Sequence, residues 1–213
     1  MKIGVSLFPG RYPIDAAVMA QKAEALGFDS FWVGEHPVMP VQSTSSAPGA
    51  SGGSIPDFYS RLVDPFVALA RASAVTTTLK LGTGVTLVPE RNPLLLAKEV
   101  ATLDYFSRRR CNSGNSKQRC RSPLRPSVRD ALMQLDSRNL AGVPRPAFRD
   151  GGLPTAFVGS PETIVKQVQQ CREEVGAGVI DLAFQSAATD DQEGVLHALE
   201  LFGKEVLPRI REI

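Results

Sequence analysis

The most constraining feature of the sequence is the stretch 80–104, in which a short apolar strand leads through a glycine-rich corner into a helix. Two glycines interrupt the predicted strand at 79–85, and glycine inside a strand indicates a bulge or a close backbone approach to a bound molecule. Asn92 is a typical helix N-cap, and Pro93 suits the first helical position. Ligands of α/β proteins bind beside such corners.

Strand and helix patterns alternate along most of the chain. A strand, a helix and a second strand come first, which predicts a parallel pair with a right-handed crossover. Three such alternations in about a hundred residues indicate an α/β layer architecture with a parallel sheet. Predicted strands lie at 2–8, 30–34, 79–85, 156–159 and 179–184, and predicted helices at 14–26, 64–74, 93–106, 128–140, 161–175 and 192–210.

Length and composition are those of a globular protein. The 213 residues predict one domain over 1–213, and 43% hydrophobic and 22% charged residues are typical of soluble proteins. A net charge of +2 does not favour nucleic acid or membrane as a partner. Three widely spaced cysteines fit a reducing compartment. No apolar run approaches a signal-peptide core or a membrane span, so we expect a cytoplasmic protein.

Two segments depart from the alternation. Residues 37–60 form a long Pro-, Ser- and Gly-rich loop, and such loops are usually functional lids or disordered. The tract 108–126 contains seven basic residues and no acidic residue. Its composition predicts a solvated low-complexity segment that supplies no core strand. Without stacking aromatic residues, any nucleic-acid binding by this tract would be weak and salt-sensitive.

Glu35 and His36 are the main candidates for chemistry. They follow the second predicted strand, on the face where active sites of parallel barrels collect. Histidine exchanges protons near neutral pH, and a neighbouring carboxylate can raise its pKa or fix its tautomer. The plain alternative is a solvated loop histidine.

Other residues are weaker candidates. Thr86 either hydrogen-bonds a ligand or simply ends a strand, and Gly159-Ser160 either binds a phosphate at a helix N-terminus or forms an ordinary cap. Arg91 is expected to make surface contacts. Aromatic side chains at strand positions are more often core than pocket, and the cysteine spacing does not fit zinc. The aromatic residues are Phe8 and Trp32, and the cysteines are Cys111, Cys120 and Cys171.

Several motifs resemble the bacterial-luciferase-like superfamily. They are the segments 27–36, 83–93 and 97–104, and the segment 32–40, Trp-Val-Gly-Glu-His-Pro-Val-Met-Pro, looks most like the branch that uses the deazaflavin coenzyme F420. The segments 158–162 and 205–208 fit the last two strand–helix units of that family. The resemblance covers about 1–107 and 155–213.

The resemblance implies a (β/α)8 TIM-barrel-type fold, but only about five strands are recognisable. Where the family would read Ser-Gly-Gly-Arg followed by a fourth strand, this chain reads Ser107-Arg-Arg-Arg110 and then the basic tract. We interpret the departure, between about 107 and 155, as an internal truncation or frameshift. Five strands cannot close an eight-stranded barrel, and an open sheet exposes edges.

The resemblance also implies an activity: hydride transfer between F420 and an organic substrate, with His36 near the reactive ring and Glu35 beside it. Gly84, Val85 and Thr86 would bind the coenzyme, with a non-prolyl cis peptide between Gly84 and Val85. The alternatives are an FMN-dependent monooxygenase of the same fold, an inactive fragment and, more distantly, nucleic-acid binding through the basic tract. The expected partner is a small-molecule substrate, and a homodimer would cover an open edge of the sheet; no metal is expected.

Overall fold

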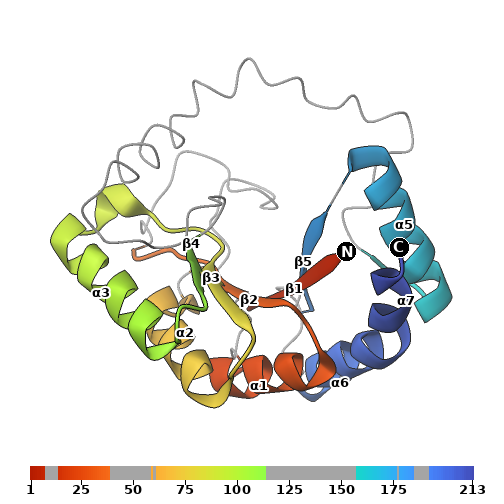
Figure 1. Cartoon of the computed structure of the whole chain (residues 1–213), viewed down its shortest axis with the longest axis horizontal. Coiled ribbons are helices and arrows are strands. Elements are labelled where there is room, and N and C mark those ends of the chain that lie inside the picture. The colour runs from red at the N-terminus through yellow and green to blue at the C-terminus, as the bar shows by residue number, and fades with distance from the viewer. Residues whose placement is uncertain (8–13, 39–58, 60, 114–156, 177, 185–191) are drawn as a thin grey trace.

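In the computed structural model, strands form the inner row of an arc and helices the outer row (Figure 1). The structure describes residues 1–7, 14–38, 59, 61–113, 157–176, 178–184 and 192–213. Several predictions fall on residues outside these ranges. They concern the helix 128–140, Phe8, Cys120, and most of the loop 37–60 and of the basic tract.

The described strands form one parallel sheet in the order β4-β3-β2-β1-β5. The expectation of a parallel, barrel-type α/β fold is therefore confirmed, and four of the five predicted strands are found. Among the described residues no strand joins β4 to β5, so the arc is open there. The strands are β1 (Lys2–Leu7), β2 (Ser30–Val33), β3 (Lys80–Thr83), β4 (Cys111–Ser113) and β5 (Val179–Ala183).

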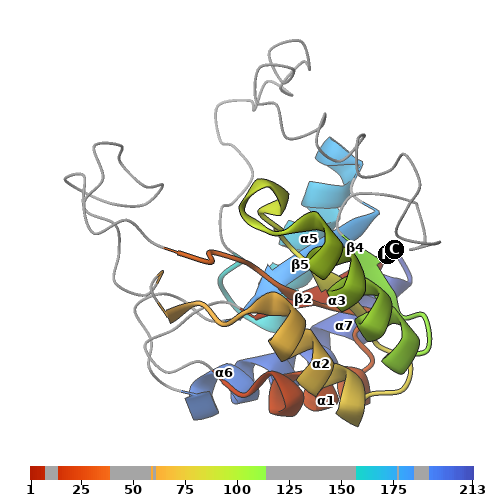
Figure 2. The ribbon, with the colours of Figure 1, turned by 90° about the vertical axis from the view of Figure 1, so that its left-hand side faces the viewer.

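The helices lie together on the convex side of the sheet (Figures 1 and 2). Crossovers with a single hand place every helix of a parallel barrel sheet on the same face. The helices are α1 (Ala16–Leu26), α2 (Pro65–Val75), α3 (Pro93–Phe106), α5 (Pro161–Val175), α6 (Gln192–Leu201) and α7 (Leu207–Arg211).

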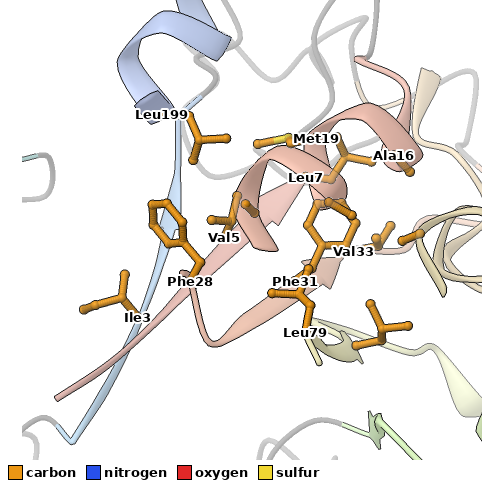
Figure 3. Close-up of a cluster of buried hydrophobic side chains, with 14 of the residues drawn as sticks. Ile3, Val5, Leu7, Ala16, Met19, Phe28, Phe31, Val33, Leu79 and Leu199 are labelled. Carbon is orange, nitrogen blue, oxygen red and sulfur yellow. The ribbon is translucent and has the colours of Figure 1, made fainter. Parts of the chain in front are cut away.

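The core lies between the sheet and these helices (Figure 3). Successive strand residues point to opposite faces, so the apolar positions of each strand face the helices. Fully or almost fully buried examples are Ile3, Val5, Leu7, Phe31, Val33, Leu79 and Leu81. The helices contribute Met19, Leu69, Val168, Leu199 and Ile210.

The concave face of the sheet is polar. Trp32 donates its indole N–H to Ser30 Oγ at 2.8 Å. Asp181 of β5 also lies over Gly4, where a Cβ atom would come within 1.9 Å of Asp181 Oδ1 and 2.7 Å of Trp32 Nε1. Burial raises the pKa of the Asp181 carboxyl, although the Trp32 hydrogen bond opposes that shift. Only glycine at position 4 leaves room for this polar group.

Local sequence signals set several helix ends, among them the predicted cap at Asn92. Asn92 and Asp64 cap α3 and α2 by accepting two backbone N–H groups each, and Ser160 accepts from Thr163 N at the start of α5. Gly27 and Gly176 end α1 and α5 at φ +88° and +70°, a conformation that glycine adopts without the steric cost that other residues incur.

The last predicted helix, 192–210, is divided. A π-helical turn, Phe202–Val206, separates α6 from α7. Within this turn, a Cβ atom on Gly203 would come within 2.8 Å of Leu26 Cβ, so glycine permits close packing on α1. Pro208 follows in α7 and has no N–H for the ordinary helical bond.

Two strand predictions are wrong. The tract 108–126 was expected to supply no core strand, but its first residues form β4, which pairs with β3. Conversely, the predicted strand 156–159 is absent among its described residues, 157–159, which have no regular structure. A strand of three residues depends on its neighbour for stability, so composition alone does not predict it.

The turn before β4 explains how this strand is reached. Arg108 and Arg109 have φ +56° and +64°, the left-handed region that favours glycine. Arg110 then turns inward and donates to the carbonyl oxygens of Ser73, Thr76, Leu79 and Ser107 at 2.8–3.0 Å. The end of α2 and the start of β3 are therefore held by one arginine.

Replacing Arg108 and Arg109 with glycine should stabilise the protein. The double variant removes left-handed strain of ~1 kcal/mol or more per residue, partly offset by the entropy of glycine in the unfolded chain. We expect a net gain of about 1 kcal/mol, measured by urea denaturation. Lys98→Gly in the exposed middle of α3 also loses a positive charge, but it should destabilise by about 1 kcal/mol. A double variant less stable than wild type would contradict the assignment of backbone strain to Arg108 and Arg109.

Glu24 makes stability dependent on pH. Burial opposes its ionisation, but hydrogen bonds from the backbone of Thr77, Thr78 and Leu79 outweigh that effect and lower its pKa from 4.5 to about 2. Its folded pKa lies below its unfolded value, so the stabilisation is present above pH 4.5 and is lost as pH falls to about 2.

Glu24→Gln should therefore cost about 1–2 kcal/mol at pH 7, after allowance for solvent screening. The difference between wild type and variant should shrink as pH falls from 4.5 toward 2. Urea midpoints measured at several pH values test this. A constant difference over that range would show that the charge of Glu24 is not the cause.

Candidate active site

The carboxyl ends of β2 and β3 lie side by side and bring two separate sequence motifs together. Gly84 N donates to Val33 O at 2.8 Å, and Leu87 N donates to Glu35 Oε2 at 2.6 Å. The motif 35–36 and the corner 84–86 therefore share one rim of the sheet, as the parallel arrangement predicts.

Glu35 is fully buried at this rim, and both of its carboxylate oxygens are occupied. Oε2 accepts from Leu87 N, and Oε1 accepts from Arg91 Nε at 2.6 Å. The Glu35 side chain is 0% exposed. In this arrangement, Glu35 fixes the corner after β3 and presents no free oxygen at the surface of the rim.

Arg91 forms the centre of a charged cluster, so the expectation of surface contacts is wrong. Its side chain is only 14% exposed. Besides Glu35, its guanidinium donates to Asp64 Oδ2 at 2.7 Å and to Glu99 Oε2 at 3.1 Å, and it lies 4.9 Å from the centre of the Phe66 ring. One arginine thus joins the end of β2, the start of α2 and the middle of α3.

The cluster affects the titration of Asp64. Burial alone would raise its pKa, but hydrogen bonds from Arg91 and from the backbone of Val67 and Phe66, with the charge of Arg91, hold it below the ordinary value. Asp64 is therefore both the N-cap of α2 and a charged partner of Arg91.

His36 is exposed at the same rim. Its ring packs edge-on against the Tyr59 ring, with 5.1 Å between the ring centres. Tyr59 lies in the segment that the sequence indicated only as a long loop. The adjacent aromatic residues Phe58 and Tyr59 have no helical or strand periodicity around them in the sequence, so sequence reasoning did not identify Tyr59.

The corner 84–86 presents mainly backbone. Gly84 is exposed, and an added Cβ would contact only the Val33 carbonyl group, at 3.8–4.0 Å. Val85 is 49% exposed and Thr86 is partly buried. The expected cis peptide is not found: the Gly84–Val85 bond is trans, like every described peptide bond.

The remaining candidates are placed as follows. Ser160 is a helix N-cap, and Trp32 is half-buried on the concave face. Cys111 lies in β4 and Cys171 in α5, both partly buried. No group of three metal-binding side chains is found in the described part of the chain. None of the described helices is long and apolar enough to cross a membrane.

Comparison with known families identifies the N-terminal part of the chain. A family model described as luciferase-like monooxygenase matches residues 1–114, which is more than half of the chain. The match extends past the predicted limit of 107 and ends just after β4. The strand that composition did not predict is therefore included in the family match.

Two relatives match the same region. An uncharacterised protein of Mycobacterium tuberculosis is 42% identical over 115 residues, which are 54% of this chain and 41% of that protein. A 5,10-methylenetetrahydromethanopterin reductase of Methanopyrus kandleri is 28% identical over 107 residues, 50% of this chain and 24% of the reductase. In each case, the matched part is less than half of the relative.

A solved structure resembles almost the whole chain. A monooxygenase from Streptomyces bottropensis has a TM-score of 0.65 and 17% identity, and the match covers 98% of this chain and 99% of the monooxygenase. At this identity, the likeness concerns the fold alone.

Arg91→Met should destabilise the protein by about 3 kcal/mol, because it leaves Glu35 charged, buried and without its cationic partner. The double variant Arg91→Met/Glu35→Gln should recover part of this loss. Glu90→Gln, at the exposed neighbouring position, serves as control and should change little. The free energy of unfolding of each variant is measured in urea. Equal stability of Arg91→Met and Arg91→Met/Glu35→Gln would contradict a buried ion pair between these residues.

Proposed function

The chain belongs to the luciferase-like monooxygenase family, and we propose that it is an oxidoreductase that transfers hydride between coenzyme F420 and a small organic substrate. The observation that carries this proposal is the shared rim: exposed His36 follows β2, and the open Gly84–Val85 backbone follows β3. The match covers less than half of the length of each of these two relatives. The proposed activity therefore depends on the rim, which lies within the matched part of the chain.

The rim fits a flat coenzyme ring in two respects. Gly84 is exposed, and an added Cβ would contact only the Val33 carbonyl group at 3.8–4.0 Å, which lets a ring approach the backbone; Val85 offers exposed apolar surface beside it. We propose that Gly84, Val85 and Thr86 hold the coenzyme. When bound, F420 would supply the hydride chemistry, as cofactors do in oxidoreductases generally.

His36 is the proposed proton donor or acceptor, because an exposed imidazole exchanges protons near neutral pH. Tyr59 packs on one side of its ring and restricts its orientation. Glu35 takes a different role from the one first expected. Its oxygens bind Leu87 and Arg91, so we propose that it supports the coenzyme corner and does not contact the ring.

The proposal of F420 rests on the resemblance of residues 32–40 to the F420 branch, and a reductase is among the relatives of this region. The alternative is a monooxygenase that uses reduced FMN and O₂. It is favoured by the description of the family model. Both coenzymes present a flat three-ring system, which the same open corner would receive.

Titration of the purified protein separates these possibilities. F420 and FMN differ in absorption and fluorescence, so each can be titrated alone and in competition. We expect saturable binding of F420 that is at least about tenfold tighter than that of FMN, or about 1.4 kcal/mol. The reverse order would favour the monooxygenase. Binding of neither coenzyme would overturn the proposal for this chain.

His36→Asn should leave coenzyme affinity within about twofold and reduce turnover about 100-fold or more, because general acid–base groups contribute rate factors of this size. His197→Asn is the matched control, since the chain contains only these two histidines and His197 is exposed on α6. Equal turnover of wild type and His36→Asn would show that His36 does not transfer the proton.

A further inference from the structure

Two aromatic rings meet at the rim from segments that are distant in sequence. His36 follows β2, whereas Tyr59 lies five residues before Asp64, the N-cap of α2. Leu62 N donates to Tyr59 O at 3.5 Å, which connects Tyr59 to the start of this helix. The edge-on contact of the two rings therefore depends on how the end of β2 is placed relative to the start of α2.

Arg91 joins these two segments directly. One part of its guanidinium binds Glu35, the residue before His36, at 2.6 Å, and another binds Asp64 at 2.7 Å. These links close on themselves, and we call them the circuit. The chain joins His36 to Glu35, Arg91 binds both Glu35 and Asp64, and the chain joins Asp64 to Tyr59, whose ring contacts His36. The third carboxylate partner of Arg91 is Glu99 of α3, at 3.1 Å, and it lies outside the circuit.

We infer that Arg91 is a positioning residue that holds the His36 ring against Tyr59 by tying the end of β2 to the start of α2. Because it is buried and makes several directed bonds at once, the planar guanidinium fixes both segments in direction as well as distance. The inference extends the proposed function by assigning the orientation of its acid–base group to Arg91 and Tyr59.

The geometry also explains why arginine is needed. Lysine carries a compact ammonium group on a flexible stem and cannot reproduce the fork that reaches Glu35, Asp64 and Glu99 together. Arg91→Lys should therefore keep a positive charge beside Glu35 but loosen the link to Asp64. This separates the charge of Arg91 from its role in joining the two segments.

The test follows the ring protons of His36 by ¹H NMR in the full chain without coenzyme. The chain has two histidines, so His197 on α6 is an internal reference. Asp64→Asn is the diagnostic variant. The amide oxygen can still cap α2 as Oδ1 does for Phe66 and Val67, but an NH₂ group replaces the oxygen that binds Arg91.

Asp64→Asn should shift the His36 resonances in the direction that Tyr59→Leu shifts them, because both reduce the effect of the Tyr59 ring. Arg91→Lys should give a smaller shift in that direction. Glu99→Gln is the matched control: it removes a charged partner of Arg91 outside the circuit and should leave His36 unchanged. His197 should not move in any variant.

Two outcomes would overturn the inference. One is a folded Asp64→Asn protein and a folded Arg91→Lys protein whose His36 resonances equal those of wild type. The other is a Glu99→Gln shift as large as that of Asp64→Asn, which would indicate general loosening. The measurement needs no coenzyme, so its result is independent of whether F420 binds.

Discussion

The described part of the chain depends on a sheet that its helices cover on the convex face. Along β1, the apolar residues Ile3, Val5 and Leu7 form one set of side chains that is directed into the helical layer, and the alternating residues Lys2, Gly4 and Ser6 form a second set on the concave face. Burial of the first set supplies the main stabilising contribution, at about 25 cal/mol per Å² of apolar surface. Because all paired strands are parallel, their carboxyl ends lie at one rim of the sheet.

At that rim, charge replaces apolar packing as the organising interaction. A buried carboxylate such as Glu35 is tolerated only with a cationic or hydrogen-bonding partner, and Arg91 provides it from the following strand–helix unit. In the proposed function, the same arginine places the exposed His36 and the corner at Gly84 relative to each other. Residues that would hold a coenzyme are thus supported by residues that do not contact it.

The turn 107–110 shows how long-range hydrogen bonds can hold a strained backbone in place. Arg108 and Arg109 occupy left-handed conformations, which glycine adopts with less steric cost than arginine. Arg110 nevertheless reaches the carbonyl groups at the end of α2. The bonds made by Arg110 oppose the strain of the two preceding residues, and β4 forms beside β3 as a result.

The sequence by itself determined the features that depend on near neighbours. The cap at Asn92 and the parallel alternation of strand and helix in the first hundred residues were predicted, because each follows from local conformation and periodicity. It also predicted that Glu35, His36 and Gly84 would share a rim. Only the tertiary structure decided which of them stays exposed, since burial depends on partners 52 and 56 residues away. Arg91, Tyr59 and the strand at 111–113 were misjudged or missed for the same reason: their roles are set by contacts across the fold, for which a single sequence contains no local signal.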